Sequence, residues 1–159
     1  MKVFIGIDPG AKGSMAVMTP NPVFVYSWDI KLVPWEDDLM PYIAALKAAK
    51  SDDPNRVLSC ALEHVGAMPG QGVTSMFNFG ANFGKIIGVL TALRVPFELV
   101  RPQRWQKDFG VSGDKAEHIA ACKRLFPNVS LLRTVRSRKD DDGHADALLL
   151  AEWSRRHHG

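Results

Sequence analysis

The sequence predicts a single α/β domain built on a mixed, five-stranded sheet. The length of 159 residues suits one hydrophobic core. Apolar segments of strand length alternate with segments of helical periodicity, and three strand segments come before the first helix. Three sequential strands favour a sheet with an antiparallel edge over an all-parallel sheet. With 46% hydrophobic and 23% charged residues, the composition is that of an ordinary globular protein.

Each element follows from local patterns. Apolar runs bounded by turn residues predict strands at 3–7, 14–18, 23–28, 57–62 and 97–100. Residues 9–13, Pro-Gly-Ala-Lys-Gly, have the composition of a turn and make the first two strands a hairpin. Helical spacing of apolar residues predicts helices at 36–50, 74–93, 115–126 and 144–155. Residues 128–141 are polar and basic, and we expect them to be flexible.

The cysteines and the N-terminus favour a cytoplasmic protein. Cys60 and Cys122 lie in apolar segments, so we expect buried free thiols and neither a disulfide nor a metal site. The sequence has no recognisable signal peptide and no run of about 18 apolar residues that would span a bilayer. We expect a bacterial or phage-infected cell as the setting, and the lack of a transit peptide disfavours an organelle.

Basic residues are concentrated in the second half of the chain. The net charge is +3 and the pI about 9.0, which alone says little about partners. The cluster comprises Arg94, Arg101, Arg104, Lys107, Lys115, Lys123, Arg124, Arg133, Arg136, Arg138 and Lys139. This distribution fits a surface that contacts phosphates and fits solvated helix faces equally well.

Four carboxylates occupy positions where they could meet. Asp8 ends the first strand, and Glu63 ends the strand after the first helix. Asp142 and Asp146 are four residues apart near the start of the last helix, so they share one helix face. Carboxylate oxygens can hold a pair of hard cations such as Mg²⁺, which clamp the attacking and leaving oxygens of a phosphodiester. The spacing therefore indicates a metal-dependent site for phosphodiester hydrolysis.

Each acid also has a simpler explanation. Asp8 precedes Pro9 and could be a turn residue, Glu63 could be a surface acid, and Asp142 could cap the last helix. Asp146 is harder to explain in this way. It lies in an alanine- and leucine-rich segment, where a lone carboxylate would be partly buried without a purpose.

Three segments together resemble the RuvC-type Holliday junction resolvases, including their phage and chloroplast relatives. They are residues 5–10 (Ile-Gly-Ile-Asp-Pro-Gly), 61–65 (Ala-Leu-Glu-His-Val) and 142–149 (Asp-Gly-His-Ala-Asp-Ala-Leu-Leu). In this order and with these gaps the resemblance runs over nearly the whole chain. It implies an RNase H-like fold with helices on both faces of the sheet. It also implies an endonuclease of DNA recombination and repair that uses two Mg²⁺ per active site, with Mn²⁺ as a substitute.

The resemblance also implies which residues hold the metal. The catalytic ligands would be Asp8, Glu63, Asp142 and Asp146. The family's fourth ligand varies between an aspartate and a histidine, one turn before the final aspartate. Asp142 occupies the i−4 position, whereas His144 at i−2 lies on the wrong face. Asp140 and Asp141 are adjacent in the same run, so the acid that is used stays open between Asp141 and Asp142.

The family implies a homodimer that cuts two opposed strands of a four-way junction, and residues 74–93 match its dimerisation helix. Interior glycines of a helix require a compensating close approach of backbones. Packing on the protein's own sheet would explain them equally well. The residues expected at the dimer interface are Gly80, Phe83, Gly84, Ile87 and Gly88. Those expected to contact DNA are Lys107, Lys115, Arg136, Arg138, Lys139, Met68, Phe77 and Phe79. Phe83 is favoured as a core residue, while Met68, Phe77 and Phe79 are left open between the core and insertion into the junction.

Three other classes compete with this interpretation. The actin-like kinases and ATPases share the opening strand, acid and glycine turn, but the chain is short for their two domains and lacks a Walker A sequence. A non-catalytic junction- or RNA-binding module of the same fold would be indicated by the loss of an acid, yet every acid is present. A different RNase H-like nuclease, acting on branched or flap DNA or on RNA–DNA hybrids, stays open.

Overall fold

The computed structural model describes residues 1–20, 28–34, 38–51, 53, 55–67 and 69–159. Its elements are β1 (Lys2–Asp8), β2 (Ser14–Pro20), β3 (Trp28–Pro34), α1 (Met40–Lys50), β4 (Val57–Glu63), α2 (Val73–Ala92), β5 (Phe97–Val100), α3 (Pro102–Phe109), α4 (Lys115–Leu125) and α5 (Asp142–His158). The sequence analysis missed α3. Of the strand expected at 23–28, residues 23–27 lie outside the described residues, and β3 is described from Trp28 to Pro34.

The sheet is mixed, as predicted. Its strand order is β3-β2-β1-β4-β5. The β1–β2 and β2–β3 pairs are antiparallel, whereas β1–β4 and β4–β5 are parallel. Ile7 pairs with Leu62 across β1 and β4. Asp8 and Glu63, one residue further along each strand, therefore leave the sheet side by side at the same edge.

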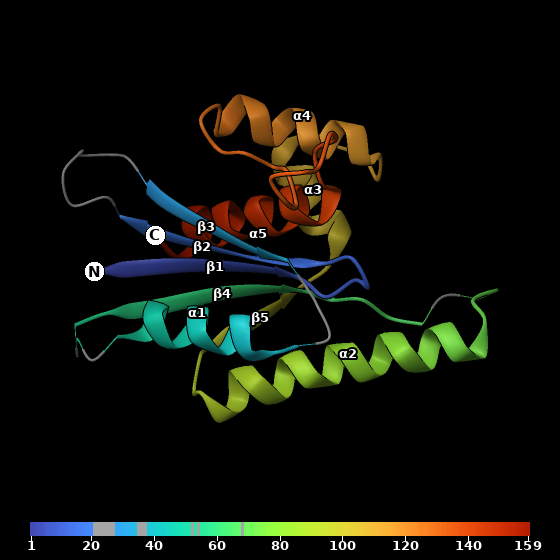
Figure 1. The fold of residues 1–159 in the computed structure, drawn as a ribbon, viewed down its shortest axis with the longest axis horizontal. Coiled ribbons are helices and arrows are strands. Elements are labelled where there is room, and N and C mark those ends of the chain that lie inside the picture. Colours follow the sequence, from blue (N-terminus) through green and yellow to red (C-terminus); the bar gives the residue numbers. More distant parts are fainter. Residues whose placement is uncertain (21–27, 35–37, 52, 54, 68) are drawn as a thin grey trace.

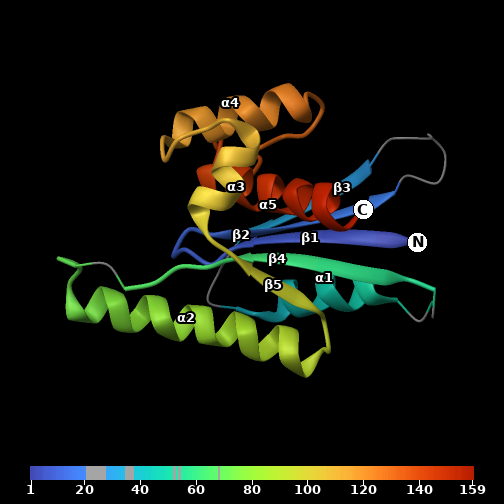
Figure 2. The same ribbon diagram turned by 180° about the vertical axis from the view of Figure 1, so that it is seen from behind.

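Helices cover both faces of the sheet. In Figure 1 the helices α1 and α2 lie on one face and α3, α4 and α5 on the other, and the view from behind in Figure 2 agrees. Alternate residues of β1 serve the two cores: Ile5 and Ile7 pack with α1 and α2, while Phe4 packs on the α5 side. None of the helices within the described ranges combines the length and the apolar character needed to cross a membrane.

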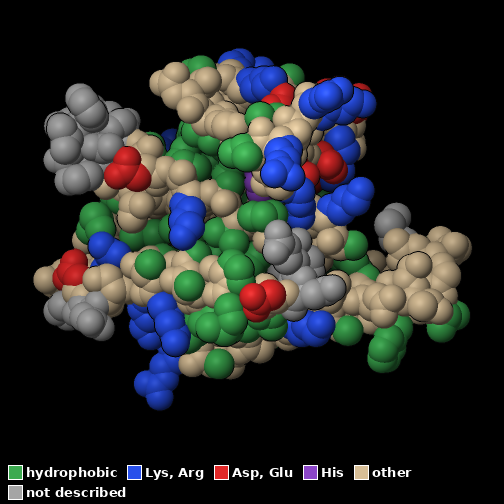
Figure 3. Space-filling model, in the orientation of Figure 1, with side chains coloured by type: hydrophobic (Ala, Val, Ile, Leu, Met, Phe, Trp, Pro, Cys, Tyr) green, Lys and Arg blue, Asp and Glu red, His purple; other side chains and the backbone are tan. Residues whose placement is uncertain are grey.

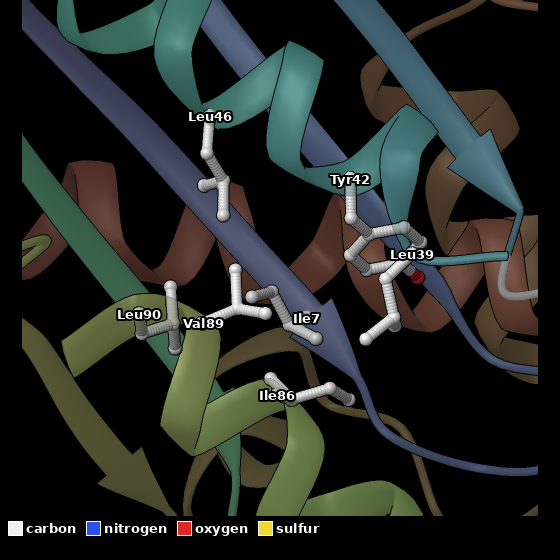
Figure 4. Close-up of a pocket in the computed structure, with 7 residues that line it drawn as sticks. All are labelled: Ile7, Leu39, Tyr42, Leu46, Ile86, Val89 and Leu90. Atoms are coloured by element: carbon white, nitrogen blue, oxygen red, sulfur yellow. The ribbon is translucent and has the colours of Figure 1, made fainter. Parts of the chain in front are cut away.

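The helix α2 is anchored mainly by its C-terminal half. Figure 4 shows Ile7 of β1 pointing between α1 and α2, toward Tyr42 and Leu46 on one side and Ile86 and Leu90 on the other. In Figures 1 and 2 the N-terminal half of α2 extends past the edge of the sheet. One end of this helix is thus part of the core, and the other end projects from it.

The helix α5 lies directly against β1. A Cβ atom at Gly6 would be 2.1 Å from the backbone oxygen of Ala147 and 2.2 Å from the backbone nitrogen of Ala151. Only glycine leaves room for this contact between strand and helix. The contact seats α5 on the strand that ends in Asp8, and so brings Asp146 to the same end of the sheet.

The two cysteines are free and buried, as predicted. Cys60 lies in the core beneath α1 and α2, and Cys122 in the core around α5. Burial raises the pKa of both thiols well above the usual range. Both side chains therefore act as small apolar groups.

Candidate active site

Three of the predicted acids lie near the carboxyl ends of β1 and β4 and influence one another electrostatically. Asp8 ends β1, Glu63 ends β4, and Asp146 lies in the second turn of α5. Burial raises the pKa of Asp8 from 3.8 to about 6. The hydrogen bond from Gly10 lowers this pKa but is outweighed, and the charge of Asp146 adds to the rise. Burial likewise raises the pKa of Glu63 from 4.5 to about 7, with further contributions from Asp8 and Asp146. The three carboxylates therefore share one electrostatic site.

Two neighbours orient the strand-end acids. The backbone N–H of Gly10, in the turn between β1 and β2, donates to Asp8 Oδ1 at 3.0 Å. The indole N–H of Trp105 donates to Glu63 Oε1, also at 3.0 Å. Trp105 is fully buried on α3, the helix that the sequence analysis missed. This short helix thus places the donor that holds Glu63.

The third acid, Asp146, is held at both of its oxygens by α4. Its Oδ1 is bonded to His118 Nδ1 at 2.6 Å, and its Oδ2 accepts from Lys115 Nζ. The other ring nitrogen of His118 lies 2.6 Å from the carbonyl oxygen of Ser112. A carboxylate and a carbonyl both accept hydrogen bonds, so beside an ionised Asp146 the ring donates from both nitrogens and is positively charged. Burial lowers the pKa of His118, but the bonds to Asp146 and Ser112 outweigh this effect and raise it.

Lys115 lies among the carboxylates. Its ammonium pairs with Asp146 and lies 3.8 Å from Asp142 Oδ2. Burial lowers its pKa, but the charge of Asp146 and the bond to it give a net rise, with smaller contributions from Asp8 and Asp142. The sequence analysis placed Lys115 on the surface that contacts DNA. In the structure its ammonium is the counter-charge of the acidic site, and the contact with DNA stays a prediction.

The structure separates the roles of Asp141 and Asp142. Asp141 is the N-cap of α5, and its Oδ1 accepts from the backbone N–H of His144 at 2.9 Å. Arg133 donates to both oxygens of Asp141 at 3.0 Å. The side chain of Asp142 is 50% exposed and faces Lys115. Asp142 therefore stays the better candidate for the fourth ligand, whereas its neighbour Asp141 caps the helix.

The remaining polar residues near the start of α5 have structural partners. His144 is buried and its Nδ1 lies 2.6 Å from Ser14 Oγ, in agreement with its low rank as a ligand. Asp140 pairs with Lys123 at 2.5 Å. His144 and Asp140 thus have partners in the structure, and Asp142 stays the predicted fourth ligand.

The donor set fits a hard divalent cation in chemistry and charge. All four candidates are carboxylates, the ligands that Mg²⁺ prefers in proteins. Within the described part of the chain, no three His, Cys, Asp or Glu side chains lie close enough together to hold a metal ion. Both oxygens of Asp146 are bonded to α4 in this arrangement. Each oxygen keeps a second lone pair, so a cation that binds Asp146 competes mainly with the positive charges of Lys115 and His118.

A basic surface lies beside the site. Arg136, Arg138 and Lys139 are exposed in the segment before α5 and form no ion pair with any residue that the structure describes. Lys107 on α3 is also exposed. Figure 3 shows Lys and Arg side chains gathered over α4 and this segment, at the upper right of the view. The segment expected to be flexible is tied to the β1–β2 turn, because Arg133 donates to the carbonyl oxygens of Lys12 at 3.0 Å and Gly13 at 3.1 Å.

The glycine row of α2 faces away from the sheet. Gly80, Gly84 and Gly88 are exposed, and a Cβ atom added at any of them meets no atom within 4 Å. Packing on the protein's own sheet, the alternative explanation for these glycines, is therefore wrong. Phe83 and Ile87 are partly buried against the core, which confirms the core role expected for Phe83.

The aromatic residues expected to contact DNA differ in exposure. The side chain of Phe77 is 76% exposed near the projecting end of α2, whereas Phe79 is partly buried. Met68 lies outside the described residues. Of the three side chains left open, Phe77 is thus available on the surface.

One curated protein shares part of this sequence. No family model matches the chain. Over 89 residues the chain is 29% identical to the chloroplast Holliday junction resolvase MOC1 of Chlamydomonas reinhardtii. The match covers 55% of this chain and 10% of that protein, so the chain corresponds to about a tenth of the length of this relative.

Solved structures match the fold over almost the full length. The RuvC of T. thermophilus in complex with a Holliday junction substrate superposes with a TM-score of 0.60 at 16% identity, covering 98% of this chain and 96% of that one. A second Thermus thermophilus RuvC structure gives a TM-score of 0.53 at 15% identity, covering 94% and 90%. Five strands in the order β3-β2-β1-β4-β5, with helices on both faces, thus give this chain the RNase H-like fold of the RuvC-type Holliday junction resolvases.

Proposed function

We propose that the chain is a metal-dependent endonuclease that resolves four-way DNA junctions. The observation that carries this proposal is the electrostatic coupling of Asp8, Glu63 and Asp146, which come from three separate elements. Desolvation and mutual repulsion make buried carboxylates costly for folding, and Lys115 and His118 supply two positive charges to four candidate acids, so the site points to a further cationic partner. The RuvC solved with a Holliday junction substrate has the same fold and supports this substrate class.

The four acids would present the metal-binding oxygens from three elements of the fold. Asp8 and Glu63 present oxygens whose directions are fixed by Gly10 and Trp105. Asp146 and Asp142 present oxygens from α5. A pair of Mg²⁺ ions, when bound, supplies the charge that stabilises the attacking and leaving oxygens of the phosphodiester.

The basic segment before α5 would hold the DNA backbone. Arg136, Arg138 and Lys139 are exposed next to the acids, and Lys107 extends the same charge on α3. Phosphate contacts of this kind position a duplex without reading its sequence. The exposed ring of Phe77 is the aromatic side chain best placed to meet bases of an opened junction.

A homodimer would place two such sites on opposed strands. A symmetric dimer uses the same patch on both subunits. The outward glycine row Gly80, Gly84 and Gly88 permits the close approach of two helices, and its open surroundings are consistent with that use. Phe83 and Ile87, partly buried at the edge of this row, would complete the contact.

A cleavage assay tests the proposed function. Labelled four-way junction, Y-fork, linear duplex and RNA–DNA hybrid are each incubated with Mg²⁺, with Mn²⁺ and with chelator. We expect metal-dependent, paired nicks in the junction. Asp8→Asn, Glu63→Gln and Asp146→Asn should each lower the cutting rate by roughly 10²–10³ or more while junction binding persists.

A matched pair of variants tests the fourth ligand. Asp142→Asn should lower the rate severely. Asp141→Asn should cut junctions at near the wild-type rate and should lose about 1 kcal/mol of stability or less, because Asn is also a good helix cap. The reverse pattern would make Asp141 the ligand.

The other outcomes distinguish the competing classes. Preferred cutting of the hybrid or the Y-fork would assign the chain to another RNase H-like activity. A wild-type chain that binds the junction and cuts nothing with either metal would be a binding module. An Asp146→Asn variant with wild-type cutting would show that the site is elsewhere.

A further inference from the structure

The two bonds that hold Asp146 come from consecutive turns of one helix. Lys115 and His118 are three residues apart at the start of α4, so their side chains share a face. His118 bonds to Oδ1 of Asp146, and Lys115 bonds to Oδ2. One helix therefore contacts both oxygens of an acid on another helix.

The two bonds differ in how firmly the donor is held. The side chain of His118 is 1% exposed, and its second nitrogen is bonded to the carbonyl of Ser112. Its ring packs edge-on to the ring of Trp105, with the two ring centroids 4.9 Å apart. The side chain of Lys115 is 54% exposed, and its ammonium pairs with the acids Asp146 and Asp142. His118 is thus fixed from three sides, whereas Lys115 reaches the acids from a half-exposed position beside solvent.

We infer that His118 is a positioning residue for Asp146 and that Lys115 is the cation which a divalent metal ion displaces from it. The inference rests on the proposed metal site and states which bond of Asp146 opens. The Oδ2 atom becomes available when the exposed ammonium leaves. The Oδ1 atom stays bonded to His118, which keeps the carboxylate in place.

Variants of Lys115 test the displacement. In Lys115→Met the side chain keeps most of its length and loses the competing charge, so Mg²⁺ and Mn²⁺ should bind about tenfold more tightly than in the wild type. Lys115→Arg keeps the charge and should bind them no more tightly than the wild type. Isothermal titration of the full chain without DNA measures both, and Asp146→Asn identifies the heat that belongs to this site.

Variants of His118 separate positioning from packing. Asn places its amide N–H where Nδ1 lies, so His118→Asn keeps the bond to Asp146 and removes the bond to Ser112. Gln places its amide where Nε2 lies, so His118→Gln keeps the bond to Ser112 and removes the bond to Asp146. Metal affinity should stay within about threefold of the wild type in the Asn variant. It should fall roughly 10- to 100-fold in the Gln variant, as it does when partners of metal ligands are removed.

Nuclear magnetic resonance of the wild type gives a second measurement, which needs no variant and so does not depend on whether the variants fold. On addition of Mg²⁺ the Nδ1–H signal of His118 should persist, and the side-chain ammonium signal of Lys115 should move toward that of a solvated lysine. Loss of the His118 signal with retention of the Lys115 signal would overturn the inference. Equal affinities of the two His118 variants, or an unchanged affinity in Lys115→Met, would overturn it as well.

The outcome is separable from that of the proposed function. The expected metal-binding pattern in a chain that cuts no junction leaves the inference standing and removes the nuclease. Metal-dependent cutting without the expected pattern does the opposite. A wild type that binds neither cation overturns the inference, and the junction assay then decides the function alone.

Discussion

The helices α5 and α2 lie on opposite faces of the sheet and relate to it in different ways. All twelve residues from Gly143 to Ser154 of α5 are buried. In the longer α2 only Ile86 and Leu90 are fully buried, although most of its residues are apolar or glycine. Apolar content alone therefore does not decide which helix is enclosed.

The position of the glycines accounts for the difference. On the α5 side the glycine belongs to the strand, at Gly6, and lets the helix touch β1. On the other side the glycines belong to α2 and point away from the sheet. Glycine thus brings a helix toward the chain's own sheet in the first case, and leaves an open, exposed helix surface in the second.

The largest effect is expected from a substitution that breaks the contact between β1 and α5. Gly6→Val adds side-chain atoms where a single Cβ already overlaps the backbone of Ala147 and Ala151. Neither backbone group can move aside alone, so we expect a loss of more than about 3 kcal/mol in the free energy of unfolding, or no folded protein. Urea unfolding followed by circular dichroism measures this. A Gly6→Val chain of wild-type stability would refute the role given to this contact.

The second effect concerns the charges enclosed on the α5 side. The pKa of Glu63 is raised from 4.5 to about 7, so without metal the folded state keeps a proton that the unfolded state has lost. The raised pKa of Glu63 therefore costs the folded state nothing below about pH 4.5. The free energy of unfolding falls as the pH rises, and the loss is complete once the pH has passed about 7. At 1.36 kcal/mol per pH unit, the cost near pH 8 is about 3 kcal/mol.

Glu63→Gln removes this cost and keeps an oxygen for Trp105. In chelator at pH 8 the variant should therefore be more stable than the wild type, and at pH 4.5 the two should be nearly equal. Thermal unfolding at both pH values measures the difference. A variant that is less stable at pH 8 would show that burial and the neighbouring acids do not destabilise ionised Glu63.

The third effect concerns the basic segment before α5 and its contacts with DNA. Replacing Arg136, Arg138 and Lys139 with alanine should reduce the slope of log affinity against log salt concentration by roughly 0.9 for each phosphate that is no longer neutralised. Fluorescence anisotropy with a labelled junction gives the slope. Alanine at Lys31, which lies on β3 away from the acids, is the control and should leave the slope unchanged. An unchanged slope in the triple variant would mean that these charges are only solvated.

The smallest effect on folding is expected at α2. Gly84→Ala should change the free energy of unfolding by no more than about 1 kcal/mol, and in the stabilising direction, because alanine favours a helix and meets no neighbour. Gly84→Glu should also fold but should be a monomer by light scattering, whereas the wild type should be a dimer at micromolar concentration. A monomeric wild type would defeat the proposed dimer, and an unfolded Gly84→Glu would contradict the outward glycine row.

The sequence predicted most of the sheet because its signals there are local. The buried strands ending at Asp8 and Glu63, and the pair Asp142 and Asp146 at helical spacing, are readable from neighbouring residues. The helix α3 was missed because it is short and its burial rests on Trp105 and Phe109 alone. Their i, i+4 spacing between Pro102 and Gly110 was the available signal.

The partners of Asp146 could not be predicted in the same way. Lys115 and His118 lie 31 and 28 residues away, and nothing in their spacing indicates which acid they meet. A lysine in a basic half of the chain fits a phosphate contact as well as an internal ion pair. Only the packing of α4 on α5 decides between these two roles.

The contact at Gly6 has a consequence for redesign of this protein. The atoms that meet Gly6 are main-chain atoms of α5, so this contact requires glycine at residue 6 and leaves the exposed positions elsewhere free to vary. A library that fixes residue 6 and the four acids, and randomises exposed positions of α2 and of residues 134–139, would vary partner and nucleic-acid preference on a constant framework. Selectivity could then evolve while the placement of the acids is inherited unchanged.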